Sequence, residues 1–416
     1  MSGRTKAAVR GNMLRWARQT SGYQIDEVAA RMGLAFSPER ILAMEADAEK
    51  PSIAQAKNLA KIYGRSLSLL YLPEPPAEPD PPADFRMGYD GLDQEISPAL
   101  RKLVRRMQEL RESALDLADD LDETNDRFPI VPLQGSLDQD PALLVGPVRH
   151  WLGIDADVQS QWRDPKLAFD HWRAALESRG VIVYVELGAH SVSTEEVRGF
   201  CLAEDQAPLI VVNNLDAKAA QVFTLFHELG HILLRLPAMC LDMDQEEAGQ
   251  DQMSRVEVWC NRFAGEFLVP RATVSEHPLA ALMAERLVES PSAAHEEWDD
   301  DLRELAAFFA VSAEVIVRRL TVLGWLTAKH YRAWKNAWYE RHPNKPKAKT
   351  KGKGGPSPAQ LAPTKYGMGI LSLVYSAYWS DAVSALEVGS LIGGKTKTVK
   401  QLEGTVRRRL AEAVSL

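Results

Sequence analysis

The stretch Phe223-Thr-Leu-Phe-His227-Glu228-Leu-Gly-His231-Ile-Leu-Leu234 decides how the middle of this chain folds. Its apolar residues recur at helical intervals, and it follows the β-rich run Pro208-Leu-Ile-Val-Val212. We expect a helix over about 217–234 with Asp216 as its N-cap. Side chains four residues apart share one face of a helix, so His227 and His231 can bind a single metal ion.

Glu228, next to the first histidine, completes the pattern His-Glu-x-x-His, which is typical of zinc peptidases. Its carboxylate can take a proton from water on the metal ion, which is the role of a general base. The alternative is a pair of core histidines that bind no metal. We favour a zinc site because the pattern lies on an apolar helix directly after a β-rich run.

A catalytic zinc ion needs a third protein ligand besides the two histidines. The next predicted helix, over about 254–267 and ended by Pro270, offers Glu257 and Glu266. Glu257 is flanked by valines and a tryptophan, and a carboxylate that faces inward among such residues needs a partner. The residues alone leave open whether Glu257, Glu266 or neither of them binds the ion.

The remaining patterns predict an α+β fold that is mostly helical. Two β-rich runs, 181–185 and 208–212, with Gly199-Phe-Cys-Leu202 between them, predict a small sheet of short strands. Further helices are expected over 97–124, over 164–178 and, as a pair around Val311-Ser312, within 300–324.

Two segments of unusual composition divide the chain into domains. Residues 74–83 are rich in proline and predict a stiff, extended linker. Residues 341–365 are rich in lysine, proline and glycine without an apolar period, and predict a disordered basic linker. We therefore expect a front domain over 1–73, a middle domain over 84–340 and a short helical C-terminal domain over 366–416.

The front domain is positively charged in a chain whose net charge is −8. Residues 1–73 hold 11 Lys and Arg against 6 Asp and Glu, and such asymmetry favours a nucleic-acid partner. Apolar periodicity and helix-start signals predict four short helices, over 12–19, 24–32, 37–46 and 52–63.

An ordered set of motifs runs through the middle domain: Asp84-Phe85-Arg86, Arg198-Gly199-Phe200, Ile210-Val-Val-Asn213, the His-Glu-x-x-His helix and the run from Glu257 to Pro270. On these residues the domain resembles the ImmA/IrrE family of metallopeptidases. The resemblance implies a zincin-like fold, zinc (Zn2+) held by His227, His231 and Glu257, and Glu228 as the catalytic base. Asn213 and Asn261 match family positions and are expected to support the site. Members of the family cleave or inactivate a repressor partner.

The front domain carries a second set of motifs: Gln24-Ile-Asp-Glu-Val28-Ala29, Met32-Gly33, Ile41-x-x-x-Glu45, Pro51-Ser52 and Leu67-Ser-Leu-Leu-Tyr71-Leu-Pro73. On these residues, the segment 10–72 resembles the lambda-repressor-like (XRE-type) helix-turn-helix. The resemblance implies that the third helix enters the DNA major groove, with Gln24, Ser37, Glu39 and Arg40 nearest to DNA.

The helix-turn-helix pattern has two departures here. Two extra residues lie between Gly33 and Glu45, and the usual Glu-x-Gly becomes Glu45-Ala46-Asp47. The helix expected in the groove offers one cation and two carboxylates, so its attraction to phosphate is weak. Protein docking or dimerisation therefore stays an alternative to DNA binding for this domain.

Chains that fuse these two domains resemble antitoxins encoded beside a PIN-domain ribonuclease toxin, and the C-terminal domain could bind such a partner. Two functions follow. The protein is either a DNA-binding regulator whose zinc metallopeptidase cleaves or inactivates a partner protein, or an antitoxin and autorepressor that neutralises a toxin by binding, with catalysis unused. The expected partners are its own promoter DNA, a repressor or toxin, and a second copy of the chain.

Composition limits where the protein works. The longest uncharged stretch, 366–380, is 15 residues, short of the roughly 20 that span a bilayer. The 3 cysteines are scattered, which fits a reducing compartment. We therefore expect a soluble, cytoplasmic protein without a membrane partner. Arg255, Arg262 or a tyrosine could stabilise the oxyanion, and the sequence does not choose among them.

Overall fold

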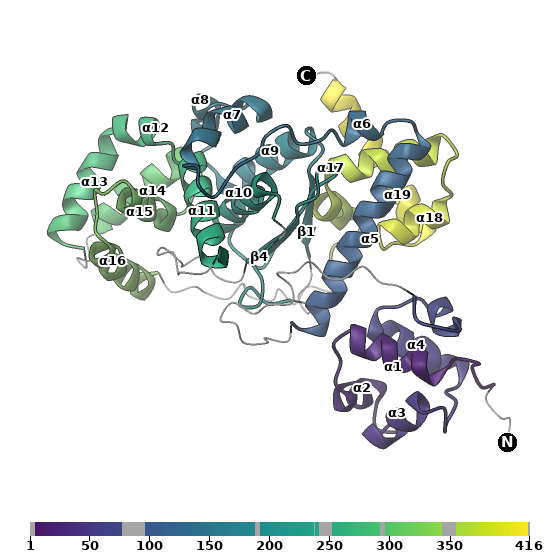
Figure 1. Ribbon diagram of the computed structural model, residues 1–416. Coiled ribbons are helices and arrows are strands. Elements are labelled where there is room, and N and C mark those ends of the chain that lie inside the picture. Colours follow the sequence, from purple (N-terminus) through teal and green to yellow (C-terminus); the bar gives the residue numbers. More distant parts are fainter. Residues whose placement is uncertain are drawn as a thin grey trace. The chain divides into compact units, whose positions relative to one another are not determined.

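The structure is a computed structural model, and it describes residues 5–76, 96–187, 192–236, 238–240, 252–291, 296–342 and 355–414. Its contacts divide the chain into two compact units, Met1–Glu109 and Leu110–Leu416, and the boundary falls within helix α5 (Pro98–Asp120) (Figure 1). Most of the predicted proline-rich linker and the motif Asp84-Phe85-Arg86 lie outside the described residues. No helix in the described ranges is long and apolar enough to span a membrane.

The front unit contains the four predicted helices, each with ends within 1 residue of those expected. Their apolar faces enclose one small core that includes Val28, Ile41 and Leu59. The structure therefore confirms the helix pattern of this domain. The helices are α1 (Gly11–Thr20), α2 (Ile25–Met32), α3 (Pro38–Glu45) and α4 (Ile53–Tyr63), followed by the 3-10 turn η1 (Ser68–Tyr71).

The departure from Glu-x-Gly has a structural explanation. Glu45 is buried, and its carboxylate accepts two hydrogen bonds from the guanidinium of Arg18, at 2.7 and 3.1 Å. Asp47 has φ of 60°, in the left-handed region that glycine adopts at least cost and that aspartate tolerates. Its side chain accepts hydrogen bonds from the backbone of Gly11 and from Lys50. Asp47 thus stands where the usual pattern has glycine, and its two hydrogen bonds offset the cost of the left-handed backbone conformation.

The second unit is built on a four-stranded sheet in the order β1-β3-β2-β4. Strand β3 pairs in parallel with β1 and antiparallel with β2, which in turn pairs antiparallel with β4. The three predicted runs are confirmed as strands, and β4 is an addition that the sequence pattern did not predict. The strands are β1 (Ile182–Glu186), β2 (Gly199–Leu202), β3 (Leu209–Asn213) and β4 (Ala238–Cys240).

Helices cover both faces of this sheet. Val183 and Val185 of β1 belong to the main apolar core, together with Trp172 of α9 and Phe226 of α10. Tyr184, which alternates with them, packs edge-on against Tyr366 of α17, with ring centroids 5.6 Å apart. Because neither face is open to water, the strands read as continuous apolar runs in the sequence.

The helix α10 (Lys218–Leu234) crosses the core beside α11 (Gln252–Leu268), as Figure 1 shows. A side chain at Gly230 would come within 3.1 Å of the sulfur of Cys260, so the glycine permits this close approach. The prediction of Asp216 as N-cap is wrong, since Ala217 is the N-cap. Asp216 lies one residue too early, and its carboxylate pairs with Arg198 instead.

The other helices of the second unit surround this pair. The predicted helix over 164–178 is confirmed as α9, and the pair within 300–324 as α14 and α15, whereas α7, α8, α12, α13 and α16 were not predicted. Their bounds are α6 (Thr124–Arg127), α7 (Ala142–Leu152), α8 (Ala156–Ser160), α9 (Pro165–Glu177), α12 (Arg271–Glu276), α13 (Pro278–Glu289), α14 (Glu296–Phe309), α15 (Ala313–Val322) and α16 (Ala328–Arg341).

The C-terminal segment belongs to the second compact unit. The helices α17 (Pro358–Trp379), α18 (Ala385–Leu391) and α19 (Thr396–Val414) pack together, and α17 lies against β1 and α9. The prediction of a disordered linker over 341–365 is wrong for the last part of that range, because α17 already begins at Pro358. Ser357 and Gln360 form a capping box there, a start signal that the surrounding lysines and glycines obscured.

Helix α17 has a sharp kink at Gly367, whose φ of 73° is left-handed. A β-carbon at this position would lie 1.7 Å from a carboxylate oxygen of Glu177, so only glycine fits. Glu177 forms an ion pair with Arg173 at 2.7 Å and accepts a hydrogen bond from the backbone of Gly369. Arg173 in turn donates to the carbonyl of Thr364. This buried pair fastens α17 to α9.

Candidate metal centre

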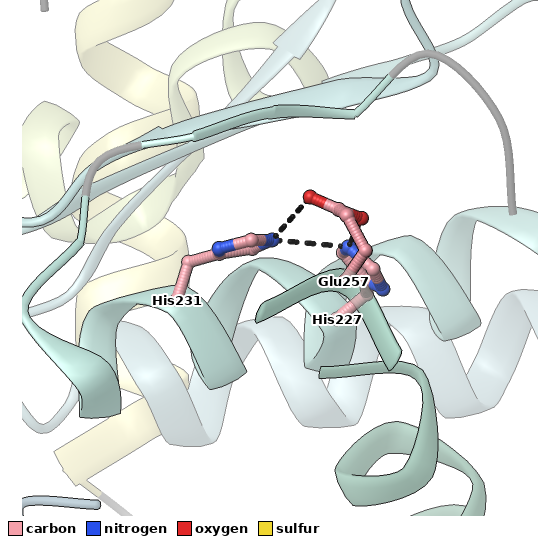
Figure 2. A group of neighbouring side chains, drawn as sticks. All are labelled: His227, His231 and Glu257. Carbon is pink, nitrogen blue, oxygen red and sulfur yellow. Dashed lines mark hydrogen bonds and ion pairs between the residues drawn. The ribbon is translucent and has the colours of Figure 1, made fainter. Parts of the chain in front are cut away.

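Three ligand-type side chains meet between α10 and α11. His227 and His231 come from one face of α10, and Glu257 faces them from α11, as Figure 2 shows. The Nε2 atoms of the two histidines are 3.1 Å apart, and they lie 3.1 and 3.3 Å from the two oxygens of Glu257. All three side chains are buried, with exposed fractions of 0 to 1%.

The geometry of this cluster fits a tetrahedral metal ion. Ligand atoms at about 2.0–2.1 Å from a tetrahedral zinc ion are separated from one another by about 3.3 Å. The measured separations of 3.1 to 3.3 Å match that spacing. Within the described ranges, these three residues form the one His/Cys/Asp/Glu group whose ligand atoms lie close enough together to hold an ion. They could therefore bind a metal in a site with one position left for another ligand.

The electrostatics of the cluster favour a bound cation. Burial raises the pKa of Glu257, but the two histidines more than offset it and hold that pKa far below its usual range. Burial lowers the pKa of His231, whereas at His227 the charge of Glu257 outweighs burial and raises the pKa. Glu257 is thus an ionised carboxylate in an apolar interior, and such a group requires a positive partner.

Asn261 fixes the orientation of one imidazole. Its side-chain oxygen accepts a hydrogen bond from Nδ1 of His227, at 2.9 Å, from one turn beyond Glu257 on α11. With the proton on Nδ1, the lone pair of Nε2 points toward the cluster. A hydrogen bond of this kind sets the tautomer of a histidine ligand.

Glu228 is fully buried beside the ligands, and β2 approaches it closely. A β-carbon at Gly199 would lie 3.1 Å from an oxygen of Glu228 and 2.4 Å from a methyl group of Thr224. Glycine at the start of β2 therefore allows the sheet to pack directly on the face of α10 that carries Thr224 and Glu228.

Comparison with known families agrees with this architecture. Residues 185–321, from the end of β1 to α15, match the family model described as the IrrE N-terminal-like domain, and this range includes the whole cluster. Residues 14–70 match a helix-turn-helix model. The chain is an XRE-type helix-turn-helix joined to an ImmA/IrrE-type domain. No curated protein matches the chain.

The remaining predicted site residues of the ImmA/IrrE-type domain lie outside the cluster. Asn213 ends β3, donates to the carbonyl of Val197 at 2.9 Å and accepts from the backbone of Leu215, so it shapes the turn that precedes α10. Glu266, the competing ligand candidate, forms an ion pair with Arg319. Arg255 pairs with Asp138. The structure thus gathers Glu257, and not Glu266, with the histidines.

The predicted DNA contacts of the helix-turn-helix domain lie at helix starts. Gln24 is the N-cap of α2 and Ser37 the N-cap of α3, the helix expected in the groove. Glu39 is exposed on the first turn of α3. Arg40 forms a bidentate ion pair with Glu49, with the closest contact at 2.7 Å. Because this pair neutralises the single cation of α3, the surface of that helix has little net attraction for phosphate.

We predict that Gly199→Ala disrupts the ImmA/IrrE-type domain. The new methyl group must displace Thr224 or Glu228, and such overpacking costs about 1–3 kcal/mol of the free energy of unfolding. Gly404→Ala is the matched control, because nothing lies within 4 Å of its added carbon and alanine favours a helix by about 0.5–1 kcal/mol. Chemical denaturation measures both variants. A Gly199→Ala protein as stable as wild type would contradict the close packing of β2 on α10.

Proposed function

We propose that the protein is a DNA-binding regulator whose ImmA/IrrE-type domain is a zinc metallopeptidase that cleaves a partner protein. The observation that carries this proposal is the buried cluster of His227, His231 and Glu257, together with Glu228, which directly follows His227 in α10. Three ligands and a neighbouring base are the set that a catalytic zinc site requires, whereas a structural zinc site has four protein ligands.

The residues divide the work of peptide hydrolysis. His227, His231 and Glu257 would hold zinc, which supplies Lewis-acid chemistry that polarises a carbonyl and acidifies water. Glu228 removes a proton from the attacking water and then donates it to the leaving amine. Asn261 keeps His227 in the tautomer whose Nε2 is free to bind. The apolar surroundings of α10 strengthen the charge interactions of the three ligand residues and of Glu228.

The edge of the sheet is suited to hold an extended polypeptide. Strand β4 pairs with β2 on one side, and the described part of the chain has no strand on its other side. Cys240 of β4 lies opposite Gly199, the residue that approaches Glu228. A polypeptide substrate could therefore add a strand to this edge of β4.

A second function has support from the burial of the cluster. The ligands and Glu228 have exposed fractions of 1% or less, as in metal sites that serve stability. The alternative is an antitoxin and transcriptional autorepressor that neutralises a toxin by binding, with catalysis unused. The two functions share one architecture and differ in whether Glu228 is needed.

We predict about one zinc ion per chain. Metal analysis of the purified protein should give this ratio, and His227→Ala should abolish it because two protein ligands hold zinc poorly. Glu257→Gln should lose most of the metal, and Glu266→Gln, its matched control on the same helix, should keep it. If the Glu266 variant loses zinc and the Glu257 variant retains it, the third ligand is Glu266 and not Glu257.

We predict that Glu228→Gln abolishes cleavage while the zinc content stays unchanged. The amide keeps the shape of the side chain but cannot accept the proton, and a general base contributes about 10²–10⁴-fold to rate. Wild type and variant are each expressed with the product of the neighbouring gene, and partner integrity and cell growth are followed. If the variant protects cells fully and wild type leaves the partner intact, the antitoxin function replaces the peptidase.

We predict binding of the full chain to its own promoter, as a dimer on a two-fold site, with an affinity that falls as salt increases. Glu39→Gln removes an exposed carboxylate from the start of α3 and should strengthen this binding. Titration against promoter and random duplexes at two salt concentrations measures both effects. Equal affinity for the two duplexes would assign the domain to protein docking instead.

A further inference from the structure

A cavity of about 750 Å³ opens beside the metal centre. Its walls come from α10, α11, α15 and the segment at Asp140, with one residue each from the starts of α12 and α16. A cavity of this size can hold a few side chains of a polypeptide. It is distinct from the cluster itself, because none of the three ligand residues lines it.

The cavity and the centre share a wall. Asn261, which accepts the hydrogen bond from His227, lines the cavity. Phe223 also lines it, one helical turn before His227, and the two rings have centroids 6.4 Å apart. A group bound in the cavity is thus separated from His227 by the side chain of Asn261 or of Phe223.

The charge of the cavity is positive. Four arginines line it against two carboxylates, those of Asp140 and Glu266. Two of the arginines are already paired: Arg319 with Glu266, and Arg318 with Glu314 at 3.1 Å. Burial raises the pKa of Glu314, but Arg318, Lys335 and two tyrosine hydroxyls outweigh it and lower that pKa to about 2, so the pair persists at neutral pH.

The other two arginines face solvent. Arg262 and Arg271 are exposed, and neither guanidinium forms an ion pair with another residue in the described ranges. Burial lowers the pKa of Arg319 and Glu266 raises it, and the nearby charge of Arg271 lowers it again. Arg262 and Arg271 thus leave two guanidinium groups in the lining against the one remaining carboxylate, that of Asp140, and such a surplus of positive charge can bind an anion.

We propose that this cavity binds an acidic side chain of the polypeptide substrate, held by Arg262 and Arg271. The inference rests on the proposed peptidase function and adds the substrate class: a partner with Asp or Glu at a fixed position near the cleaved bond. Guanidinium groups form charge-assisted, bidentate hydrogen bonds with carboxylates. Phe223, Val258 and Val315 provide apolar wall for the methylene groups of that side chain.

The first experiment determines cleavage preference. The zinc-loaded full chain is incubated with synthetic peptides randomised at every position, and mass spectrometry locates the cleaved bonds. Asp and Glu should be enriched at one position, about 10- to 100-fold, as expected for one or two charge-assisted hydrogen bonds. Arg262→Gln/Arg271→Gln should lose this enrichment. Arg408→Gln/Arg409→Gln, an equal charge change on α19, should keep it, since α19 does not line the cavity.

Charge reversal separates recognition from a merely structural effect. Arg262→Glu/Arg271→Glu should transfer the preference to Lys and Arg at the same position, while zinc content and the circular dichroism spectrum stay at wild-type values. Enrichment of Asp and Glu that survives either double substitution would overturn the proposed cavity function, and the peptidase function would stand.

A binding measurement keeps the two proposals distinguishable. The Glu228→Gln protein is titrated against a labelled decapeptide of alternating Ala and Glu and against its Ala–Gln counterpart. Tighter binding of the acidic peptide, lost when Arg262 and Arg271 are also changed to Gln, supports the cavity even if wild type cleaves no peptide. If cleavage is absent and binding does not depend on these arginines, both proposals fail.

Discussion

The contact between α10 and α11 determines whether this protein has a metal centre. Two histidines on one helix are fixed by the helical repeat alone, but the third ligand comes from another helix and reaches them only if the two backbones approach closely. Gly230 provides that approach, because a side chain there would press on Cys260, which directly precedes Asn261 and lies three residues after Glu257. The positions of Glu257 and Asn261 therefore depend on the absence of a single methyl group.

Electrostatics reinforces this packing. An ionised carboxylate at Glu257, nearly inaccessible to water, would be costly in an ordinary core, and its neighbours reduce that cost by presenting two imidazoles. Burial also raises the pKa of the Cys260 thiol, so this sulfur stays protonated and packs as a small apolar group against α10. The interface thus combines one charged residue that matches a cation, the hydrogen bond between His227 and Asn261, and apolar contacts.

The sequence could predict the elements whose signal is local. The histidine helix, the strand runs and the four front helices all have a clear period or cap, and they are present where expected. The choice between Glu257 and Glu266 could not be made locally, because both lie on one helix and only its rotation against α10 separates them. The cavity had no signal either, since Arg262, Arg271 and Phe223 line one space only after α10, α11 and α12 have packed. The start of α17 was misjudged because a capping box of two residues was outweighed by the composition around it.

The kink of α17 has a practical consequence for dissecting the chain. Glu177 occupies the space that a β-carbon at Gly367 would need, and Tyr366 covers Tyr184 on the edge strand β1. A truncation that ends near residue 342 would remove the backbone partners that α17 offers to the Arg173–Glu177 pair, and it would expose Tyr184 on the sheet. Such a fragment is expected to aggregate on expression, although it would contain every residue of the metal centre. The ImmA/IrrE-type domain of this protein therefore cannot be shortened to the segment that its motifs occupy.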